Sequence, residues 1–223
     1  MTATLTPQAA LRELRTLVPD TRAYLAILER AARRRALLRY GNDPVGWMNE
    51  YVWCKDFEAR PPCVFKLTLW PWQADFVTEF FEHKGPEPYR EIILKSRGVG
   101  ATTTSISLAT YLAWARAPHQ TLIESETEPK AWDLMRRHKF TVSRLPPEIG
   151  YPTPGSGDAD NLSSRIFPNG SEIHSLSGNP DAIHTYHPSL ILIDEAAYVR
   201  EDFRAAIIGT KADVIVMSTA NGM

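Results

Sequence analysis

The stretch EIILKSRGVGATTT, residues 91–104, predicts a strand that runs into a phosphate-binding loop and then into a helix. A standard phosphate loop carries a lysine before its final serine or threonine, whereas this chain has Ala101 followed by Thr102. A lysine does stand at the front of the loop, Lys95, and Arg97 follows it two residues later. The functional interpretation therefore depends on whether Lys95 can supply the positive charge that Ala101 lacks.

The loop has the composition of a phosphate cradle. Gly98 and Gly100 allow backbone N–H groups to turn inward toward phosphate oxygens at the start of a helix. The hydroxyl of Thr102 stands where such loops carry a ligand of Mg²⁺. The residues that we expect to bind the nucleotide here are Ser96, Gly98, Val99, Gly100, Ala101, Thr102 and Thr103. Taken alone, the stretch is also compatible with a purely structural strand-to-helix turn.

A second motif, LILIDEAAYV at residues 190–199, supplies the acidic half of a nucleotide site. Its unbroken apolar run is typical of a strand buried on both faces of a parallel sheet. We expect Asp194 to hold hydrated Mg²⁺ and Glu195 to orient and deprotonate the attacking water. For this segment alone, two solvated acids after a core strand are the alternative. The loop and the two acids, in this order, together predict a Mg²⁺-dependent ATPase.

Two cationic side chains are catalytic candidates for the charge that develops on the transferred phosphoryl group. Lys95 is preferred because it starts from a rigid strand, which fixes the origin of its side chain. Arg97 is placed to make a forked contact to phosphate, or to a carboxylate that braces the loop.

The composition is that of an ordinary globular protein. The 223 residues, 43% hydrophobic and 23% charged, suffice for one α/β domain with an N-terminal appendage. The net charge of −1 means that contact with nucleic acid would need a local basic patch. We find no apolar run of about 20 residues and no basic-then-apolar leader, so we expect neither a membrane span nor secretion. Cys54 and Cys63 are expected to be buried free thiols in a reducing compartment.

The chain divides into two predicted parts, a helical appendage over residues 1–43 and an ATPase domain over 44–223. From residue 91 onward, apolar strands alternate with helical stretches, which is the pattern of a mainly parallel α/β sheet flanked by helices. The strands are expected at 91–95, 121–125, 190–194 and 214–218, the helices at 103–117 and 128–145, and a hairpin at 163–176. Residues 41–90 are expected to form a loop-rich, aromatic linker.

The appendage is expected to be two helices, over residues 6–18 and 21–40, interrupted by Pro19 and Asp20. Its second helix carries a cluster of arginines, Arg33, Arg34, Arg35 and Arg39. A solvated helix face is the expected role of this cluster, and contact with nucleic acid is the alternative.

In combination, these motifs resemble the ATPase domain of a large terminase, the motor that packages DNA into tailed-phage capsids. SRGVGATT resembles the deviant phosphate loop of that family, and LILIDEAAYV resembles its acidic motif with the catalytic glutamate. TLWPWQADFV, residues 68–77, resembles the adenine-recognising segment, with Gln73 as the residue that reads the base edge. Beside Gln73, we expect Trp70 and Trp72 to be core residues rather than adenine-stacking ones.

Two further segments carry the resemblance, which covers about residues 44–223. FPNGSEIHSLSGNPDAIHTYHPSLILIDEAA matches the family's run up to the acidic motif in order and spacing. VMSTANG, residues 216–222, resembles the motif that couples hydrolysis to movement. That likeness places Ser218, Thr219 and Asn221 near the γ-phosphate.

The resemblance implies an ASCE-type (RecA-like) P-loop NTPase fold, ATP and Mg²⁺ as ligands, and a ring of subunits around double-stranded DNA. It further implies a portal protein and a small terminase subunit as partners, on a procapsid in the cytoplasm of an infected bacterial host. We expect the isolated domain to be a monomer.

Three departures from the family pattern bear on function. Ala101 replaces the usual lysine, although some terminases resemble this chain in carrying the lysine at the front of the loop. His184 stands where family members often have an arginine that reaches the neighbouring subunit, and the alternatives are Arg136, Arg137 and Arg165. A large terminase continues into a nuclease domain, whereas this sequence ends at Met223, so no nuclease activity is predicted for it.

Two other classes of function remain open. A DExx helicase-like ATPase would share the loop, the two acids and a Ser-Thr motif, but it needs a second RecA-like domain. A non-hydrolysing P-loop module that serves as an interaction platform is favoured by Ala101 and disfavoured by Glu195.

Overall fold

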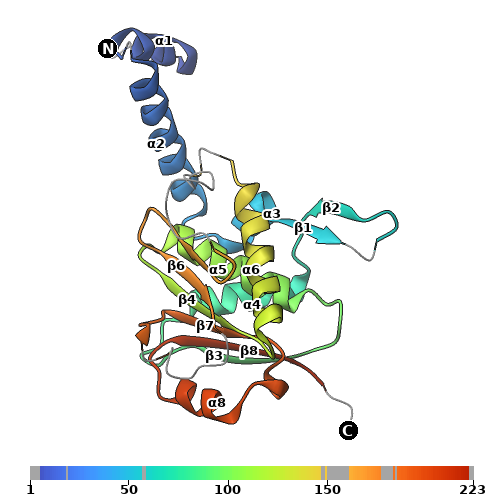
Figure 1. Ribbon diagram of the computed structural model, residues 1–223. Coiled ribbons are helices and arrows are strands. Elements are labelled where there is room, and N and C mark those ends of the chain that lie inside the picture. Colours follow the sequence, from blue (N-terminus) through green and yellow to red (C-terminus); the bar gives the residue numbers. More distant parts are fainter. Residues whose placement is uncertain are drawn as a thin grey trace.

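Figure 1 shows the structure, a computed structural model, as a sheet flanked by helices, with a helical arm that leads away from it. The structure describes residues 6–18, 20–56, 59–146, 149, 161–176, 183 and 185–220. Predicted site residue Asn221 and position His184 lie outside the described residues.

The main sheet has six strands in the order β3-β8-β7-β4-β6-β5. The strands are β3 (Arg90–Lys95), β4 (Gln120–Glu124), β5 (Ser164–Ile166), β6 (Glu172–Ser175), β7 (Leu190–Ile193) and β8 (Asp213–Thr219). Every neighbouring pair is parallel except β5 with β6. The predicted strands and the mainly parallel sheet are confirmed. The predicted hairpin is the β5–β6 pair, which turns at Gly170 with a φ of 80°.

Strand β8, the last along the described chain, is inserted between β3 and β7. Its Thr219 lies opposite Lys95 of β3, and its Val216 lies opposite Ile193 of β7. The strand that enters the loop and the strand that precedes the two acids are therefore separated by one strand. This is the strand order expected of the ASCE class.

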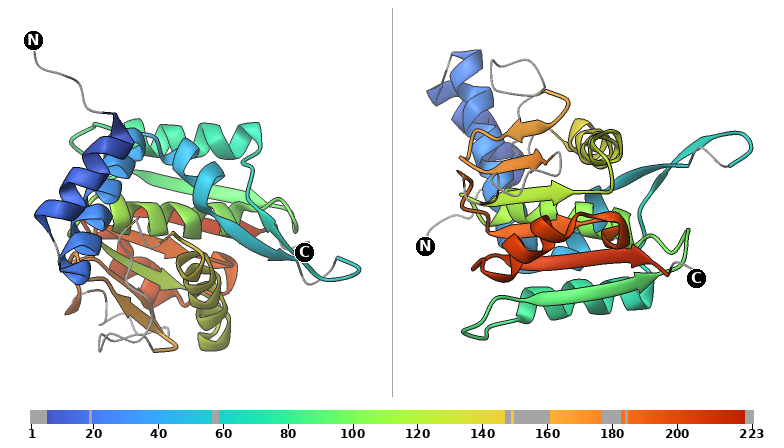
Figure 2. Two further views of the ribbon diagram at one scale, coloured as in Figure 1. Left: turned by 90° about the horizontal axis from the view of Figure 1, so that it is seen from above. Right: turned by 60° about the horizontal axis from the view of Figure 1, so that its bottom comes forward.

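Helices cover both faces of the sheet, but unequally (Figure 2). On one face lie α3 (Pro44–Tyr51), α4 (Pro71–Glu82), α5 (Ala101–Ala115) and α6 (Glu128–Ser143), and on the other lies α8 (Glu201–Ile208), which follows the short 3-10 helix η2 (Ala196–Tyr198). Alternate residues of β7 face opposite sides, so the run LILI supplies two cores. Leu190 and Leu192 join the core that contains α5, whereas Ile191 and Ile193 join the core that contains α8.

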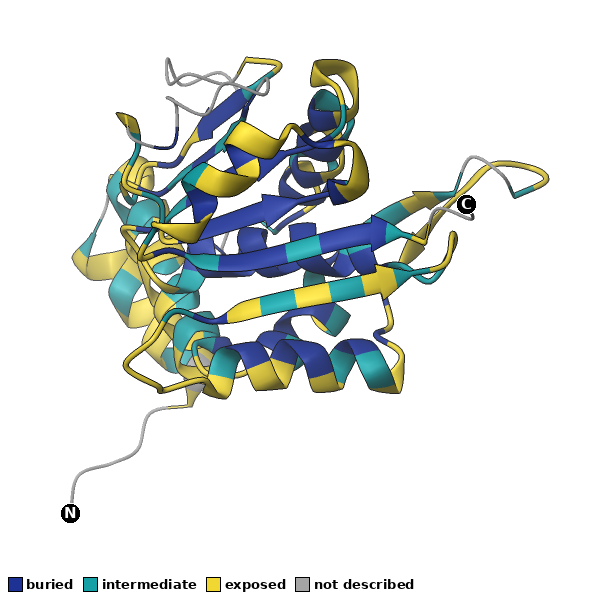
Figure 3. Cartoon of the chain, turned by 90° about the horizontal axis from the view of Figure 1, so that it is seen from below, coloured by how far each residue is buried: buried dark blue, intermediate teal, exposed yellow. Residues whose placement is uncertain are grey.

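Strand β3 is the edge of the sheet, and among the described residues it pairs only with β8. Its residues alternate between exposed and half-buried, in contrast to the buried strands beside it (Figure 3). The side chains of Ile92 and Leu94 are 70% and 75% exposed. The strand that leads into the phosphate loop thus has one covered face and one open face.

The prediction of a loop-rich linker over residues 41–90 is wrong. This segment contains α3, α4 and a hairpin of β1 (Trp53–Asp56) and β2 (Cys63–Lys66). Trp47 of α3 is fully buried and stacks on Trp114 of α5 with ring centroids 5.6 Å apart. The elements are short, and contacts with distant aromatic residues stabilise them, so little local periodicity marks them in the sequence.

The predicted N-terminal helices are confirmed as α1 (Pro7–Leu17) and α2 (Thr21–Tyr40). The side chains of Thr6 and Asp20 cap them by accepting hydrogen bonds from backbone N–H groups in the first turn. In the arginine cluster of α2, Arg34, Arg35 and Arg39 are exposed and Arg33 is half-buried. The domain boundary at residue 43 stays a prediction.

The cysteines only partly follow the prediction. Cys54 is half-buried, and burial raises the pKa of its thiol to about 11. Cys63 is exposed at the start of β2, so the prediction of a buried thiol is wrong there. Separately, none of the described helices is both long enough and apolar enough to cross a membrane.

Candidate nucleotide site

The carboxyl ends of the parallel strands meet at one edge of the sheet, and a pocket of about 870 Å³ opens there. We call it the strand-end pocket. Ligands of open α/β sheets bind outside the carboxyl ends of their strands, so its location suits a ligand. Its walls include Lys95, Ser96, Arg97, Glu126, Lys130, Glu195, Tyr198 and Thr219.

The phosphate loop, residues 96–100, leads from β3 into the N-terminus of α5. Gly98 and Gly100 have φ angles of 80° and 79°, a left-handed conformation that favours glycine. No atom lies within 4 Å of where a Cβ of Gly98 would stand, so the backbone there is open to a large ligand. The first N–H groups of α5 have no partner within the helix, and they suit phosphate oxygens.

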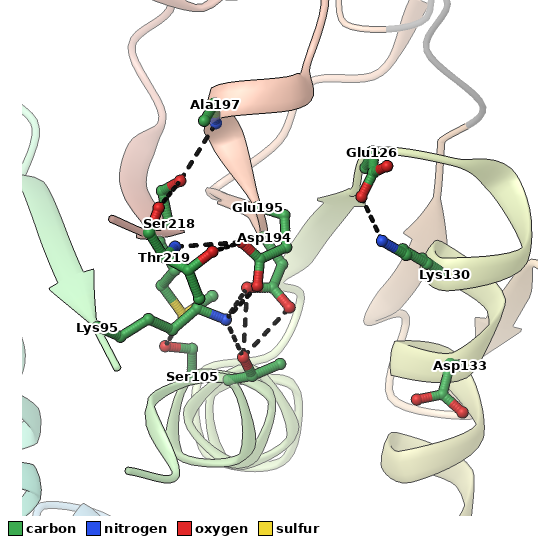
Figure 4. A network of polar contacts seen from close by, with 12 residues as sticks. Lys95, Ser105, Glu126, Lys130, Asp133, Asp194, Glu195, Ala197, Ser218 and Thr219 are labelled. Atoms are coloured by element: carbon green, nitrogen blue, oxygen red, sulfur yellow. Dashed lines mark hydrogen bonds and ion pairs between the residues drawn. The ribbon is translucent and has the colours of Figure 1, made fainter. Parts of the chain in front are cut away.

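Lys95 reaches across the pocket edge to both acids (Figure 4). Its Nζ lies 2.6 Å from Oδ1 of Asp194 and 3.2 Å from Oε1 of Glu195. It also donates a hydrogen bond to Oγ1 of Thr102 at 2.9 Å. The side chain is 9% exposed, so its three donors are directed at these three residues in a largely dry setting. The structure thus brings the predicted lysine, hydroxyl and carboxylates together.

Thr102 and Asp194 fit the requirements of Mg²⁺. Oγ1 of Thr102 lies 3.2 Å from each carboxylate oxygen of Asp194. Mg²⁺ prefers such hard oxygen ligands and is commonly held by one or two protein groups together with water and phosphate oxygens. The described residues contain no cluster of three His, Cys, Asp or Glu side chains that could form a complete metal cage. The donor set therefore suits a magnesium ion bound with a phosphate ligand.

Glu195 follows β7 in an unusual backbone conformation. Its φ of 52° makes it the one non-glycine residue with positive φ in the described part of the chain. Thr219 of β8 holds its Oε2 with two hydrogen bonds, from the backbone N at 3.1 Å and from Oγ1 at 2.9 Å. Strain of this kind is found where the surrounding structure fixes a side chain for a task.

The charge state of Glu195 follows from these contacts. Burial raises the pKa of its carboxyl, but the hydrogen bonds from Thr219 and the charge of Lys95 outweigh burial. The pKa therefore lies below its ordinary value, and the carboxylate is ionised at neutral pH. Oε1 faces Lys95 and Oε2 faces Thr219, so both carboxylate oxygens are engaged.

The other predicted residues are distributed around the pocket. Ser218 is buried beneath the pocket floor, and its Oγ accepts a hydrogen bond from the N–H of Ala197 at 3.3 Å. Ala101 is 2% exposed and belongs to the core. Thr103 instead lines a smaller pocket of about 220 Å³ between α5, α6 and β1. Arg97 is exposed at the wall of the strand-end pocket.

Gln73 lies behind the phosphate loop, where it is 3% exposed and bonded to the carbonyl of Val99. Its predicted contact with adenine stays a prediction. Trp70, next to it at the start of α4, is 53% exposed, so its assignment to the core is wrong. Trp72 is half-buried and packs against the core, as predicted.

Comparison with known proteins gives the fold a precedent. The chain matches no protein-family model and no curated protein sequence. The crystal structure of the HK97 bacteriophage large terminase is similar with a TM-score of 0.60 and 17% identity, over 80% of this chain and 37% of that chain. The fold is that of a phage large terminase. The P-loop ATPase architecture predicted from the sequence is thereby confirmed.

Two further large terminases resemble the chain less closely. The ATPase domain of the Thermus phage P74-26 large terminase gives a TM-score of 0.45 and 20% identity over 63% of each chain. The large terminase of another thermophilic bacteriophage, in complex with ADP, gives 0.45 and 13%, over 66% of this chain and 38% of that one. The present chain thus spans between about a third and two thirds of these terminases. At such identities the likeness is one of fold.

The far wall of the strand-end pocket carries residues that were not predicted from the sequence. Glu126 follows β4, and Lys130 lies one helical turn later, in α6, where the two form an ion pair. The hydrogen bond from Lys130 to Glu126 raises the pKa of Lys130. Their position could have been found in the sequence, because Glu126 closely follows the carboxyl end of a predicted parallel strand.

The arginines proposed to reach a neighbouring subunit lie away from the pocket. Arg136 and Arg137 are exposed on α6, and both form ion pairs with Asp133 of the same helix. Arg165 is 6% exposed and stacks on the ring of Phe167. Burial leaves Arg165 unsuited to contact another subunit, so only Arg136 and Arg137 keep that prediction.

Proposed function

We propose that this chain is the ATP-hydrolysing motor domain of a viral large terminase, which drives double-stranded DNA into a procapsid. The observation that carries the proposal is the convergence of Lys95, Thr102, Asp194 and Glu195 on one point beside the phosphate loop. These residues come from β3, α5 and the end of β7, and neither a structural turn nor a pair of solvated acids requires them to meet.

The roles follow from the chemistry of each group. Bound Mg²⁺ would neutralise negative charge on the β- and γ-phosphates. Thr102 and Asp194 would hold it, and the glycines of the loop leave room for phosphate oxygens at the N-terminus of α5. Lys95 supplies the positive charge that Ala101 cannot. Arg97, exposed at the pocket wall, is available for a second contact to phosphate.

Glu195 is proposed to orient the attacking water and accept its proton. Its lowered pKa keeps it ionised, which a base requires, and Thr219 fixes the direction of its carboxylate. Lys95 contacts the same carboxylate, so movement of Lys95 toward phosphate would release one oxygen of Glu195. Binding of the substrate and activation of the base are thereby linked through one lysine.

The partners are proposed from the terminase fold. They are double-stranded DNA, a portal protein, a small terminase subunit and further copies of this chain in a ring, on a procapsid in the cytoplasm of an infected bacterium. The exposed arginines of α2 are available to phosphate groups, although a solvated helix face accounts for them equally well.

The test is release of phosphate from ATP by the purified protein, with Mg²⁺ and with EDTA in its place. We expect turnover only with Mg²⁺, and a loss of turnover in Asp194→Asn. ATP binding with no turnover in the presence of Mg²⁺ would instead favour the non-hydrolysing module, for which Ala101 is the supporting observation. Failure to bind ATP at all would exclude both.

A further inference from the structure

Gln73 joins helix α4 to the phosphate loop through both ends of its side-chain amide. Its Oε1 accepts a hydrogen bond from the backbone N of Trp70 at 2.8 Å, and its Nε2 donates one to the carbonyl of Val99 at 3.0 Å. The residue is 3% exposed, so water does not compete for these bonds. Removing such a buried partner leaves the opposite group unsatisfied.

The amide also packs closely against the loop. A Cβ at Gly100 would lie 2.6 Å from Nε2 of Gln73, a separation that no ordinary contact allows. Gly100 in addition has the left-handed φ of 79°. Glycine at this position therefore serves two purposes, the turn itself and the approach of Gln73.

The bond to Val99 fixes more than one carbonyl. The carbonyl of Val99 and the N–H of Gly100 belong to the same planar trans peptide unit, so they point in opposite directions. Because the carbonyl is held toward Gln73, the N–H of Gly100 is directed away from Gln73. This N–H is one of the loop donors expected to cradle phosphate.

We infer that Gln73 is a positioning residue, which sets the orientation of the Val99–Gly100 peptide and thereby the donors of the phosphate loop. Its effect is then the same for any nucleoside triphosphate, because it acts on the loop and not on the base. The inference deepens the proposed ATPase function and rests on it for its kinetic consequence, while the ordering of the loop can be measured without any nucleotide.

This role differs from adenine reading in what it predicts. Two of the four hydrogen-bonding positions of the Gln73 amide are taken by Trp70 and Val99, so one N–H and one lone pair remain. A residue that reads adenine discriminates ATP from GTP. A residue that positions the loop lowers turnover of both by the same factor.

Three variants separate these roles. Gln73→Ala removes both hydrogen bonds, and Gln73→Met removes them while keeping the length of the side chain. Gln73→Glu keeps the acceptor for Trp70 but replaces the donor facing Val99 with an oxygen. Gln120→Ala is the matched control, because Gln120 donates a comparable bond to Glu172 at the opposite end of β4, remote from the pocket.

The first measurement is hydrogen–deuterium exchange of the loop amides in the protein without nucleotide, with thermal unfolding to confirm that each variant is folded. We expect about tenfold faster exchange over residues 96–101 in all three Gln73 variants, and unchanged exchange in Gln120→Ala. If Gln73→Ala fails to fold, Gln73→Met and Gln73→Glu decide the question. Loop exchange equal to that of the parent protein in the folded variants overturns the inference.

The second measurement is kcat and KM with ATP and with GTP. We expect kcat/KM to fall about tenfold for both nucleotides, with their ratio unchanged. A loss confined to ATP means that Gln73 reads the base, and it overturns the positioning role. If the parent protein has no turnover, the proposed ATPase function fails, and the exchange measurement alone decides the role of Gln73.

Discussion

Lys95 and Asp194 form an ion pair at 2.6 Å, although they belong to strand β3 and to the end of β7, which have β8 between them. Their side chains must therefore meet beyond the end of the inserted strand. The pair links the front of the phosphate loop to the acidic motif, and most of the chemistry proposed for the site depends on it.

Replacing Lys95 with alanine should weaken nucleotide binding and abolish hydrolysis. The positive charge beside the transferred phosphoryl group is lost, and two carboxylates face each other without a cation. We expect kcat to fall by about 10²-fold or more in a phosphate-release assay. Lys211→Ala, at an exposed position away from the pocket, is the control and should retain activity.

Ala101→Lys should not raise activity. Ala101 is 2% exposed within the core, so a lysine there meets occupied space. If Ala101→Lys increases turnover by orders of magnitude while Lys95→Ala stays active, Ala101 marks a disabled site and the role given to Lys95 is wrong.

Glu195→Gln should leave ATP binding nearly intact and remove most turnover. The amide can still accept a hydrogen bond from Thr219 but cannot accept a proton from water, so a loss of about 10²-fold is expected. Comparing ATP affinity with single-turnover rates separates the two effects. Glu201→Gln, exposed on α8, is the control, and turnover of Glu195→Gln within a few-fold of the parent would refute the assignment.

Thr219→Val should shift the pH dependence of kcat. The bonds from Thr219 help to lower the pKa of Glu195, and the backbone bond remains while the hydroxyl bond is lost. The pKa should therefore rise, and the acidic limb of the profile should move to higher pH because the base must be ionised. Thr210→Val, which loses a hydroxyl bond to the carbonyl of Ile207, should leave the limb in place. An unchanged limb in Thr219→Val would mean that Glu195 does not limit the rate as a base.

Trp47→Ala should destabilise the protein strongly, because the fully buried ring packs on Tyr111 and Trp114. We expect the free energy of unfolding to fall by about 3–5 kcal/mol in urea denaturation. Trp70→Ala, whose ring is 53% exposed, should lower it by much less. Equal effects would show that α3 contributes no more to the core than a surface residue.

The isolated protein should be a monomer with weak ATPase activity. The positive charge of Lys95 is already opposed by two carboxylates, so a neighbouring subunit is needed to bring further positive charge to the phosphates. The rate per subunit should rise with protein concentration, measured beside sedimentation velocity. A high rate that is independent of concentration would contradict this expectation.

The elements with strong local signals were predictable from the sequence. The run LILI, the glycines of the loop and the two acids indicated the nature of β7 and of the nucleotide site, because burial on both faces and left-handed turns restrict residue type. The meeting of Lys95 with Asp194 was not predictable in the same way. It depends on the order of strands in the sheet, and the insertion of β8 is a tertiary feature.

Other parts were missed because their stabilising contacts are distant in sequence. Trp47 packs on residues more than sixty positions away, so α3 has little local pattern that marks it as part of the domain. Gln73 was interpreted through its resemblance to an adenine-reading residue, while its observed partner Val99 depends on how α4 packs behind the loop. Lys130 becomes part of the pocket only because α6 begins at the same edge of the sheet.

The marginal position of β3 gives the site an asymmetric mechanical support. Lys95 stands on a strand with a single ladder of hydrogen bonds, whereas the two acids follow a strand held from both sides. Loosening of one ladder would carry the lysine away and leave the carboxylates where they are. The free backbone edge of β3 can accept an additional strand, and such a strand would stiffen the lysine side of the pocket alone. Whatever binds along that edge therefore gains a means of tightening or relaxing the site without touching the nucleotide.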